Sequence, residues 1–323
     1  MCHNKKIQGK KQHCVRGSSA RDSDGRLQKK QMGFSLIELI ATMTITAVVC
    51  VLASVFMRYP IIAYADVALI GELVDSGESA LYRMSADLRE ALPNSVRVKT
   101  SGSITAIEFM NVVESQYYRA GTPTPYLKFS NAVSQFDTLG LFVDSLSNTT
   151  CIAGNCRVVV DNTGTYGANT DTPIAGLNVY NSSAAPGPSP AAGSYVMTPS
   201  NVTVTLSNAG NSGTEGQISL SSAVLFAQAS ANQLVYIVDT PISYICDTST
   251  GLLTRYWGYT VSATQPTTPG GSSAPMAQNI SACSVNYTPS TATQNGVVSM
   301  SLTFSKSGNT VRIMGQTAVR NAL

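Results

Sequence analysis

Histidine is missing from almost the whole chain, because its two histidines, His3 and His13, both lie close to the N-terminus. The rest of the chain therefore lacks the commonest general base, the usual serine triad and any histidine metal site. The sequence also contains no phosphate-binding glycine loop, no dinucleotide-binding glycine pattern and no EF-hand calcium loop. These absences predict a protein that is not an enzyme and that uses no cofactor or metal.

Charge is scarce and unevenly distributed. Charged residues make up 12% of the chain, and residues 1–33 hold nine of its 21 Lys and Arg but only two of its 18 Asp and Glu. The remaining residues hold 12 basic and 16 acidic side chains, a net charge of −4, although the whole chain carries +3. Nucleic-acid binding loses its main support, because the positive charge belongs to the N-terminal segment alone.

A long apolar run extends from Phe34 to Met57, and Glu38 is its only charged residue. Its 24 residues would form a helix of about 36 Å, which is long enough to cross a bilayer. A cleaved secretory signal is one alternative, but its apolar region is shorter, roughly 7 to 15 residues, and precedes the cleavage site. Here the small residue at a boundary is Gly33, which comes before the run.

A plain signal anchor is the second alternative, and it explains the length of the run and its basic flank. It gives no reason for Glu38, since a carboxylate at membrane depth costs about 3 kcal/mol or more and is usually functional. Basic flanks stay in the cytoplasm. The N-terminus is therefore expected in the cytoplasm, and everything after Arg58 in the periplasm.

The string KKQMGFSLIEL at residues 29–39 resembles the class III signal of type IV pilins and of type II secretion pseudopilins. The resemblance implies that a prepilin peptidase cuts between Gly33 and Phe34 and methylates the new amino group of Phe34. It also implies that Glu38 neutralises the N-terminal amine of a neighbouring subunit during assembly. A lone carboxylate and a lone ammonium are each costly in lipid, so pairing them between subunits relieves both.

By this resemblance residues 1–33 are the leader peptide. Residues 1–26 show no apolar pattern, and a start at Leu27 would give the compact leader LQKKQMG. A start-site artefact is therefore an open alternative for residues 1–26.

The segment after the leader is expected to form one long helix in two parts. Residues 34–58 are the transmembrane and assembly part, and residues 59–93 are an amphipathic part that packs on a globular domain. Pro60 is expected to kink or interrupt the helix, and Pro93 and Asn94 to end it. In the second part apolar residues recur at steps of three and four, at Leu69, Leu73, Ala80, Leu81, Met84, Leu88 and Ala91.

Residues 94–323 are expected to form an exported, β-rich domain. The β-rich runs are 96–98, 104–109, 139–143, 158–160, 202–206, 217–220, 233–238, 252–259, 297–304 and 310–313. Short strands separated by Gly, Asn, Ser and Pro favour an antiparallel sheet. Residues 162–215 and 262–277 are expected to be long loops, because they are rich in small and polar residues. The predicted fold class is therefore α+β and pilin-like, with a long N-terminal helix packed on an antiparallel sheet.

Seven cysteines are present, of which Cys2, Cys14 and Cys50 fall in the leader or the apolar helix. The other four, Cys151, Cys156, Cys246 and Cys283, lie in the expected exported domain and allow three pairings. We expect a short loop closed by Cys151 and Cys156, and a bridge between Cys246 and Cys283 across two strands. A zinc site is the alternative, but paired CxxC knuckles are absent and an oxidising compartment favours disulfides.

Three further segments, LYRMSADLREALPNSVRV at 81–98, VYIVDTPISYICD at 235–247 and LLTRYWGY at 252–259, narrow the resemblance. They look like the MshO family of minor pilins, which serves biogenesis of the mannose-sensitive haemagglutinin (MSHA) pilus and is related to PilW and J-type pseudopilins. The resemblance implies a role in pilus initiation, near the tip. Its implied partners are the prepilin peptidase, other major and minor pilins and the inner-membrane assembly platform, with no nucleic acid.

Two alternatives remain open beside this function. One is a J-like pseudopilin of a type II secretion system, and the other is a tip adhesin that binds a ligand through loop 162–215. Within the matching segments, five polar residues are candidate partner contacts: Arg83, Asp87, Arg89, Asp239 and Tyr244. The simpler interpretation is that they fix the helix to the sheet.

Overall fold

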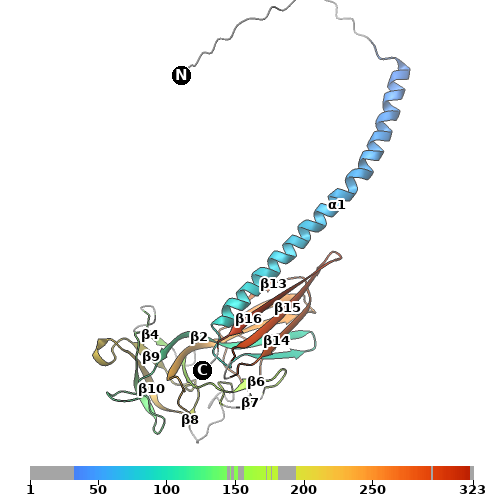
Figure 1. The fold of residues 1–323 in the computed structure, drawn as a ribbon. Coiled ribbons are helices and arrows are strands. Elements are labelled where there is room, and N and C mark those ends of the chain that lie inside the picture. The colour runs from blue at the N-terminus through green and yellow to red at the C-terminus, as the bar shows by residue number, and fades with distance from the viewer. Residues whose placement is uncertain are drawn as a thin grey trace, which may run out of the picture. The chain divides into compact units, whose positions relative to one another are not determined.

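The computed structural model describes residues 33–143, 146, 149–151, 156–171, 173–175, 177–180, 194–291 and 294–320 (Figure 1). The chain divides into two compact units, Met1–Ile62 and Ala63–Leu323. Of the predicted leader only Gly33 belongs to the described residues, and parts of the predicted loop 162–215 also lie outside them.

One helix, α1 (Leu36–Arg89), extends over 54 residues and continues through Pro60. The interruption expected at Pro60 is absent, because a proline removes a single hydrogen bond and the turns on both sides keep theirs. The helix ends at Arg89, earlier than Pro93. The chain turns into a sheet there, since Ala91 forms a β-bridge with Asn111 and the Leu92 N–H donates to the Met110 carbonyl.

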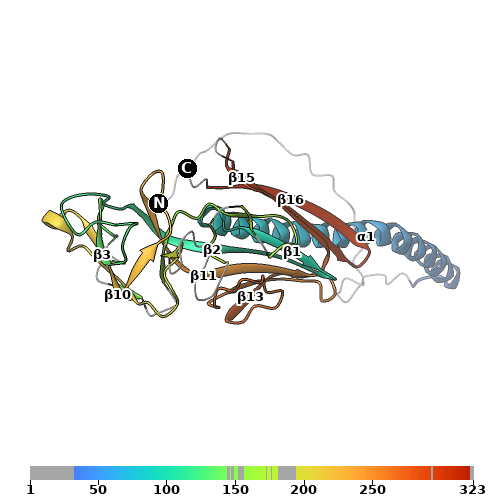
Figure 2. The same ribbon diagram turned by 90° about the horizontal axis from the view of Figure 1, so that it is seen from below.

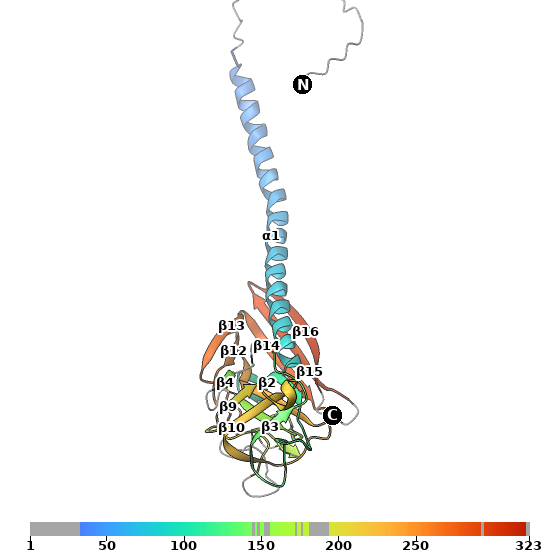
Figure 3. The same cartoon turned by 90° about the vertical axis from the view of Figure 1, so that its left-hand side faces the viewer.

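Within the unit Ala63–Leu323, helix α1 buries one stripe and exposes the opposite face. The buried residues follow helical spacing and are Leu73, Gly77, Ala80, Leu81, Met84, Asp87 and Leu88. This pattern agrees with the apolar spacing of the sequence, because residues three and four apart share a face of a helix. Figure 3 shows this part of α1 passing between the strands β12 (Leu252–Trp257) and β13 (Ser272–Ala277) on one side and the strands β15 (Gly296–Lys306) and β16 (Asn309–Val319) on the other.

The largest sheet has six strands. Its order is β1 (Arg97–Ser101), β2 (Ile104–Tyr117), β11 (Leu234–Asp247), β12 and β13, and β5 (Arg157–Val160) pairs with β11. A separate sheet of three strands has the order β14 (Ile280–Thr288), β15 and β16. Figure 2 shows β15 and β16 alongside α1, and both sheets contribute to one core with the helix.

A third sheet is built from β3 (Val133–Thr138), β10 (Gly216–Phe226), β9 (Val204–Ser207) and β4 (Thr149–Cys151), with β8 (Ser194–Tyr195) beside β10. Two short strands, β6 (Thr165–Tyr166) and β7 (Pro173–Ala175), pair with each other. Among the described ladders only β8 and β10 run parallel. The predicted α+β class, with a long N-terminal helix and antiparallel sheets, is confirmed.

The predicted strand at residues 139–143 does not form. Asn208 donates from Nδ2 to the Phe142 carbonyl at 3.0 Å and accepts the Phe142 N–H at 2.8 Å, so its side chain occupies the backbone groups that a strand partner would use. The predicted loops also contain strands. Residues 272–277 form β13, an edge strand. Half of its residues are exposed, including Pro275, so its sequence lacks an apolar alternation.

The disulfide between Cys246 and Cys283 is confirmed, with the two Cα atoms 6.6 Å apart. It links β11 of the six-stranded sheet to β14 of the three-stranded sheet. Cys156 is also disulfide-bonded. Its predicted bond to Cys151 stays a prediction, because the Cys151 side chain lies outside the described residues.

Gly77 marks the closest approach of α1 to the three-stranded sheet. A Cβ at this position would lie 2.7 Å from Phe304 Cε2 and closer still to the Cδ1 atom of Ile313. We predict that Gly77→Ala lowers the free energy of unfolding by about 1 to 3 kcal/mol, the usual cost of overpacking a core. Gly71→Ala is the control, since nothing lies within 4 Å of its Cβ position, and it should raise stability by about 0.5 to 1 kcal/mol. Urea unfolding of the fragment 63–323 measures both, and equal effects would contradict this packing.

Candidate functional site

The N-terminal part of helix α1 and the residues just before it are not covered by any other described part of the protein. Phe34 is 77% exposed, and a Cβ on Gly33 would meet nothing within 4 Å. In the unit Met1–Ile62, every described residue from 33 to 62 is exposed. Helix α1 is long and apolar enough to cross a membrane, and its most apolar window is entirely unburied. Among the described residues, none covers the peptide bond between Gly33 and Phe34.

Four hydroxyl groups of this apolar segment find their hydrogen-bond acceptors inside the helix. Thr42 donates to the Leu39 carbonyl at 3.0 Å, and Thr44 donates to the Ala41 carbonyl at 2.9 Å. In the same way Thr46 donates to Thr42 and Ser54 to Val51. No hydroxyl of these four needs water or a neighbour, which suits a segment that lies in lipid or in a dry protein interface.

Glu38 is different, because its carboxylate has no ion pair among the described residues. It lies in the first turn of α1, where its own N–H and that of Leu39 donate to the Ser35 carbonyl at 3.0 and 3.1 Å. Unsatisfied N–H groups give a helix N-terminus a partial positive charge, which favours an anion there. The position is thus compatible with a carboxylate, and it leaves that carboxylate exposed to a cation from outside the chain.

Residues 28–54 match the family model described as the prokaryotic N-terminal methylation motif. This match supports a type IV pilin-like protein. Gly33, Phe34 and Glu38 all fall inside the matched residues, so the motif also supports processing by a prepilin peptidase. No curated protein and no solved structure matches the chain.

The second half of α1 in this pilin-like chain is held to the six-stranded sheet through Asp87. The Tyr244 hydroxyl donates to Asp87 Oδ2 at 2.7 Å, and Arg255 Nε lies 2.6 Å from the same oxygen. Arg83, one helical turn earlier, pairs with Oδ1 at 3.1 Å. The Arg255 guanidinium also lies 5.0 Å from the centre of the Trp257 ring.

These contacts show that Asp87 fixes the helix to the sheet through Tyr244 and Arg255, while Arg83 contacts Asp87 from the same helix. Burial, and next the hydrogen bond to Asp87, raise the pKa of the Tyr244 hydroxyl, so it remains a donor at neutral pH. Arg255 was not among the residues singled out from sequence. It lies in the segment LLTRYWGY, two residues before the only tryptophan of the sequence, and this segment is the sequence signal that could have identified it.

Arg89 and Asp239 do not join this cluster. Arg89 is exposed at the end of α1 and lines a small cleft with Tyr236 and Arg320. Asp239 is partly buried on β11, where burial raises its pKa, and its Oδ1 has no hydrogen-bond partner within the described parts of the chain. Both residues therefore stay candidates for contacts with a partner.

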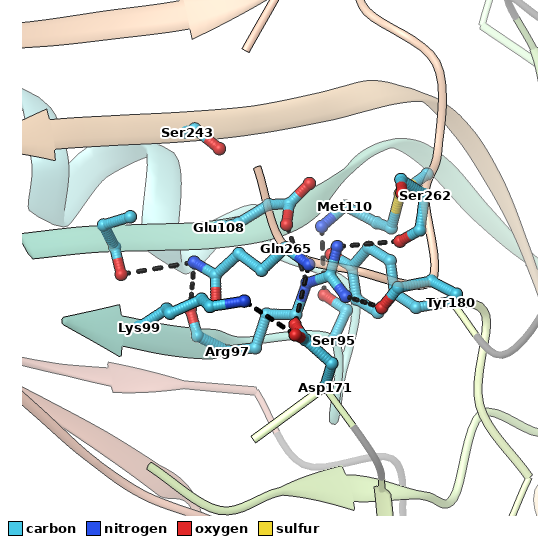
Figure 4. A network of polar contacts seen from close by, with 12 residues as sticks. Ser95, Arg97, Lys99, Glu108, Met110, Asp171, Tyr180, Ser243, Ser262 and Gln265 are labelled. Atoms are coloured by element: carbon cyan, nitrogen blue, oxygen red, sulfur yellow. Dashed lines mark hydrogen bonds and ion pairs between the residues drawn. The ribbon is translucent and has the colours of Figure 1, made fainter. Parts of the chain in front are cut away.

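A second network was not expected from the sequence, and it fixes two loops to the sheet (Figure 4). Arg97 and Glu108 are fully buried on neighbouring strands, with Arg97 Nε 2.7 Å from Glu108 Oε2. Arg97 also donates to the carbonyls of Ser262 and Ala263 at 2.8 and 2.7 Å. Its guanidinium lies 3.9 Å from the centre of the Tyr180 ring.

The rest of this network gives both buried charges further partners. The Tyr259 hydroxyl donates to Glu108 Oε1 at 3.1 Å. Burial raises the pKa of Glu108, and the Arg97 guanidinium opposes that shift. Lys99 pairs with Asp171 at 2.7 Å, and Asp171 accepts the Gln265 N–H at 2.7 Å. Because neither Arg97 nor Glu108 reaches the surface, the arrangement positions the two loops on the sheet.

We predict that Asp87→Asn lowers the free energy of unfolding by about 3 kcal/mol, because it leaves the largely buried Arg255 cation without its anion. Glu72→Gln is the matched control on the same helix. Its pair with Lys306 is mostly exposed, and such pairs contribute about 0 to 1 kcal/mol. Urea unfolding of both variants in the fragment 63–323 is the measurement, and the anchoring role is contradicted by equal losses.

Proposed function

We propose that the chain is a minor pilin of a type IV pilus of the MSHA type, with a role in initiating the filament at or near its tip. The observation that carries the proposal is the exposed apolar half of α1, whose single carboxylate stands five positions after Gly33. The chain is neither expected to catalyse a reaction nor to need a cofactor.

In this proposal the precursor lies in the inner membrane with its N-terminus in the cytoplasm and the unit Ala63–Leu323 in the periplasm. Prepilin peptidase removes the leader at Gly33 and methylates Phe34. The assembly platform then moves the subunit into the filament, where Glu38 pairs with the N-terminal amine of a neighbouring pilin. A buried ion pair between subunits is favourable here, since each charge alone is costly in an apolar surrounding.

The pilus is preferred to the secretion system because three segments resemble the MshO family. Two of them supply the anchor described above, Asp87 from residues 81–98 and Tyr244 from residues 235–247, and the third supplies Arg255. The J-like pseudopilin remains the second candidate, because pseudopilins carry the same class III signal and the same apolar N-terminal helix.

Glu38→Ala should leave membrane insertion intact, because it removes a polar group from the apolar run. Leader cleavage should also proceed, while incorporation into filaments should fall by about tenfold or more, the loss expected from one unpaired buried charge. Immunoblots of membrane and sheared-filament fractions measure both steps. Gly33→Leu is the contrasting variant and should accumulate as uncut precursor. Glu38→Ala protein that enters filaments at the wild-type level would contradict the pairing.

Deletion of the gene distinguishes a function in the pilus from a function in the type II secretion system. A minor pilin that initiates assembly should, when lost, leave few filaments on the cell and unassembled major pilin in the inner membrane. Electron microscopy of cells, together with assays of secreted proteins in the medium, is the measurement. If the deletion leaves filament numbers normal but abolishes protein secretion, the minor-pilin function is wrong and the pseudopilin function is supported.

A further inference from the structure

Strand β16 is the outer strand of its sheet, and among the described residues no strand pairs with its free edge. It is 11 residues long and pairs with β15 in one continuous register without a bulge. It contains no proline, and its one charged residue, Arg312, donates to Ser301 Oγ on β15 at 2.8 Å. Soluble proteins normally blunt such an edge with charges, prolines or bulges, because its free N–H and C=O groups attract another strand.

The helix beside this edge presents an apolar flank. Strand β16 follows α1 in the same direction, since Asn309 contacts Asp66 and Gly315 lies next to Leu81. Val74 and Val67 precede Leu81 by one and two heptads and share its side of the helix. Val67 is 68% exposed and Ile70 is 38% exposed, although both belong to the folded unit.

We propose that β16 receives an added antiparallel or parallel β-strand from a neighbouring pilin-type subunit. The free backbone edge specifies an extended partner. The flank formed by Val67, Ile70 and Val74 requires apolar side chains at alternate positions of that strand, while the outer face, with Met314 and Gln316, accepts neutral polar ones. The partner is taken to be a pilin because the flank continues along α1 into the exposed assembly segment, and this identity rests on the proposed function.

Site-specific photocrosslinking in cells that assemble filaments tests this interface on the full chain. Benzoylphenylalanine is placed at Met314 or at Gln316 on β16, and at Ser301 as a control. Ser301 pairs with Met314 but lies on the central strand β15, which has no free edge. Crosslinks from Met314 and Gln316 should map to residues two apart in one filament subunit, the spacing of a strand, and Ser301 should give none of them.

Two helix variants then test the apolar flank. Val74→Lys should lower the crosslink yield about tenfold, because it places a charge against an apolar contact. Tyr82→Lys introduces the same charge on the exposed outer face, away from β16, and should not change the yield. Retention of the disulfide between Cys246 and Cys283, scored by non-reducing peptide mapping, shows that each variant has folded.

The possible outcomes test the strand-addition interface and the proposed pilin function separately. Chain that enters filaments without crosslinks from β16, or with crosslinks spaced three or four residues apart as on a helix, overturns strand addition and leaves the pilin function standing. Crosslinks to a second copy of this chain, or to a protein outside the filament, overturn the proposed partner. Absence of the chain from filaments overturns both the proposed function and the partner derived from it.

Discussion

Packing of one stripe of α1 between two sheets is the interaction on which the folded unit depends. The stripe contributes Leu73, Met84 and Leu88 to a core that also contains residues of the six-stranded and the three-stranded sheet. Burial of apolar side chains at this junction is the main source of stability, at about 25 cal/mol per Å² of apolar surface removed from water. Gly77 permits the close approach on one side, and the disulfide between Cys246 and Cys283 holds the two sheets together.

Two buried ion pairs give this arrangement its specific geometry. Asp87 and Arg255 fix the end of the helix against β12, and Arg97 and Glu108 fix two loops over β1 and β2. Removing charges from water cancels much of the Coulomb attraction, so such pairs add little net stability to a fold. A buried charge without its partner is costly, so alternative packings that separate these pairs are unfavourable. The helix and the loops are therefore held at defined positions.

The helix, the antiparallel strands and one disulfide could be predicted because each leaves a local signal in the sequence. The apolar run from Phe34 to Met57 signals a long helix, and the spacing from Leu73 to Leu88 and the β-branched runs reflect burial that repeats along the chain. The strand expected at residues 139–143 failed because a distant side chain, Asn208, competes for its backbone. The edge strand β13 was missed because exposed strands carry little apolar pattern.

The candidate site also has a part that could be predicted from the sequence and a part that could not. Gly33, Phe34 and Glu38 form a contiguous motif, so they could be found from sequence and then matched by the family model. The anchor around Asp87 joins residues more than 150 positions apart, with separations of 157 to Tyr244 and 168 to Arg255. Tyr244 and Asp87 were noticed as polar members of two segments, but their mutual contact depends on the three-dimensional register.

The internal hydrogen bonds of Thr42, Thr44, Thr46 and Ser54 have a consequence for transfer between environments. Each hydroxyl moves together with its acceptor, so leaving lipid for a dry protein surrounding breaks none of these bonds and requires no new ones. The segment is therefore nearly neutral toward the two surroundings, and its preference is set by the few groups without partners, above all Glu38. For the function proposed above, the ionic partner of Glu38 is then the main difference between the bilayer and the filament.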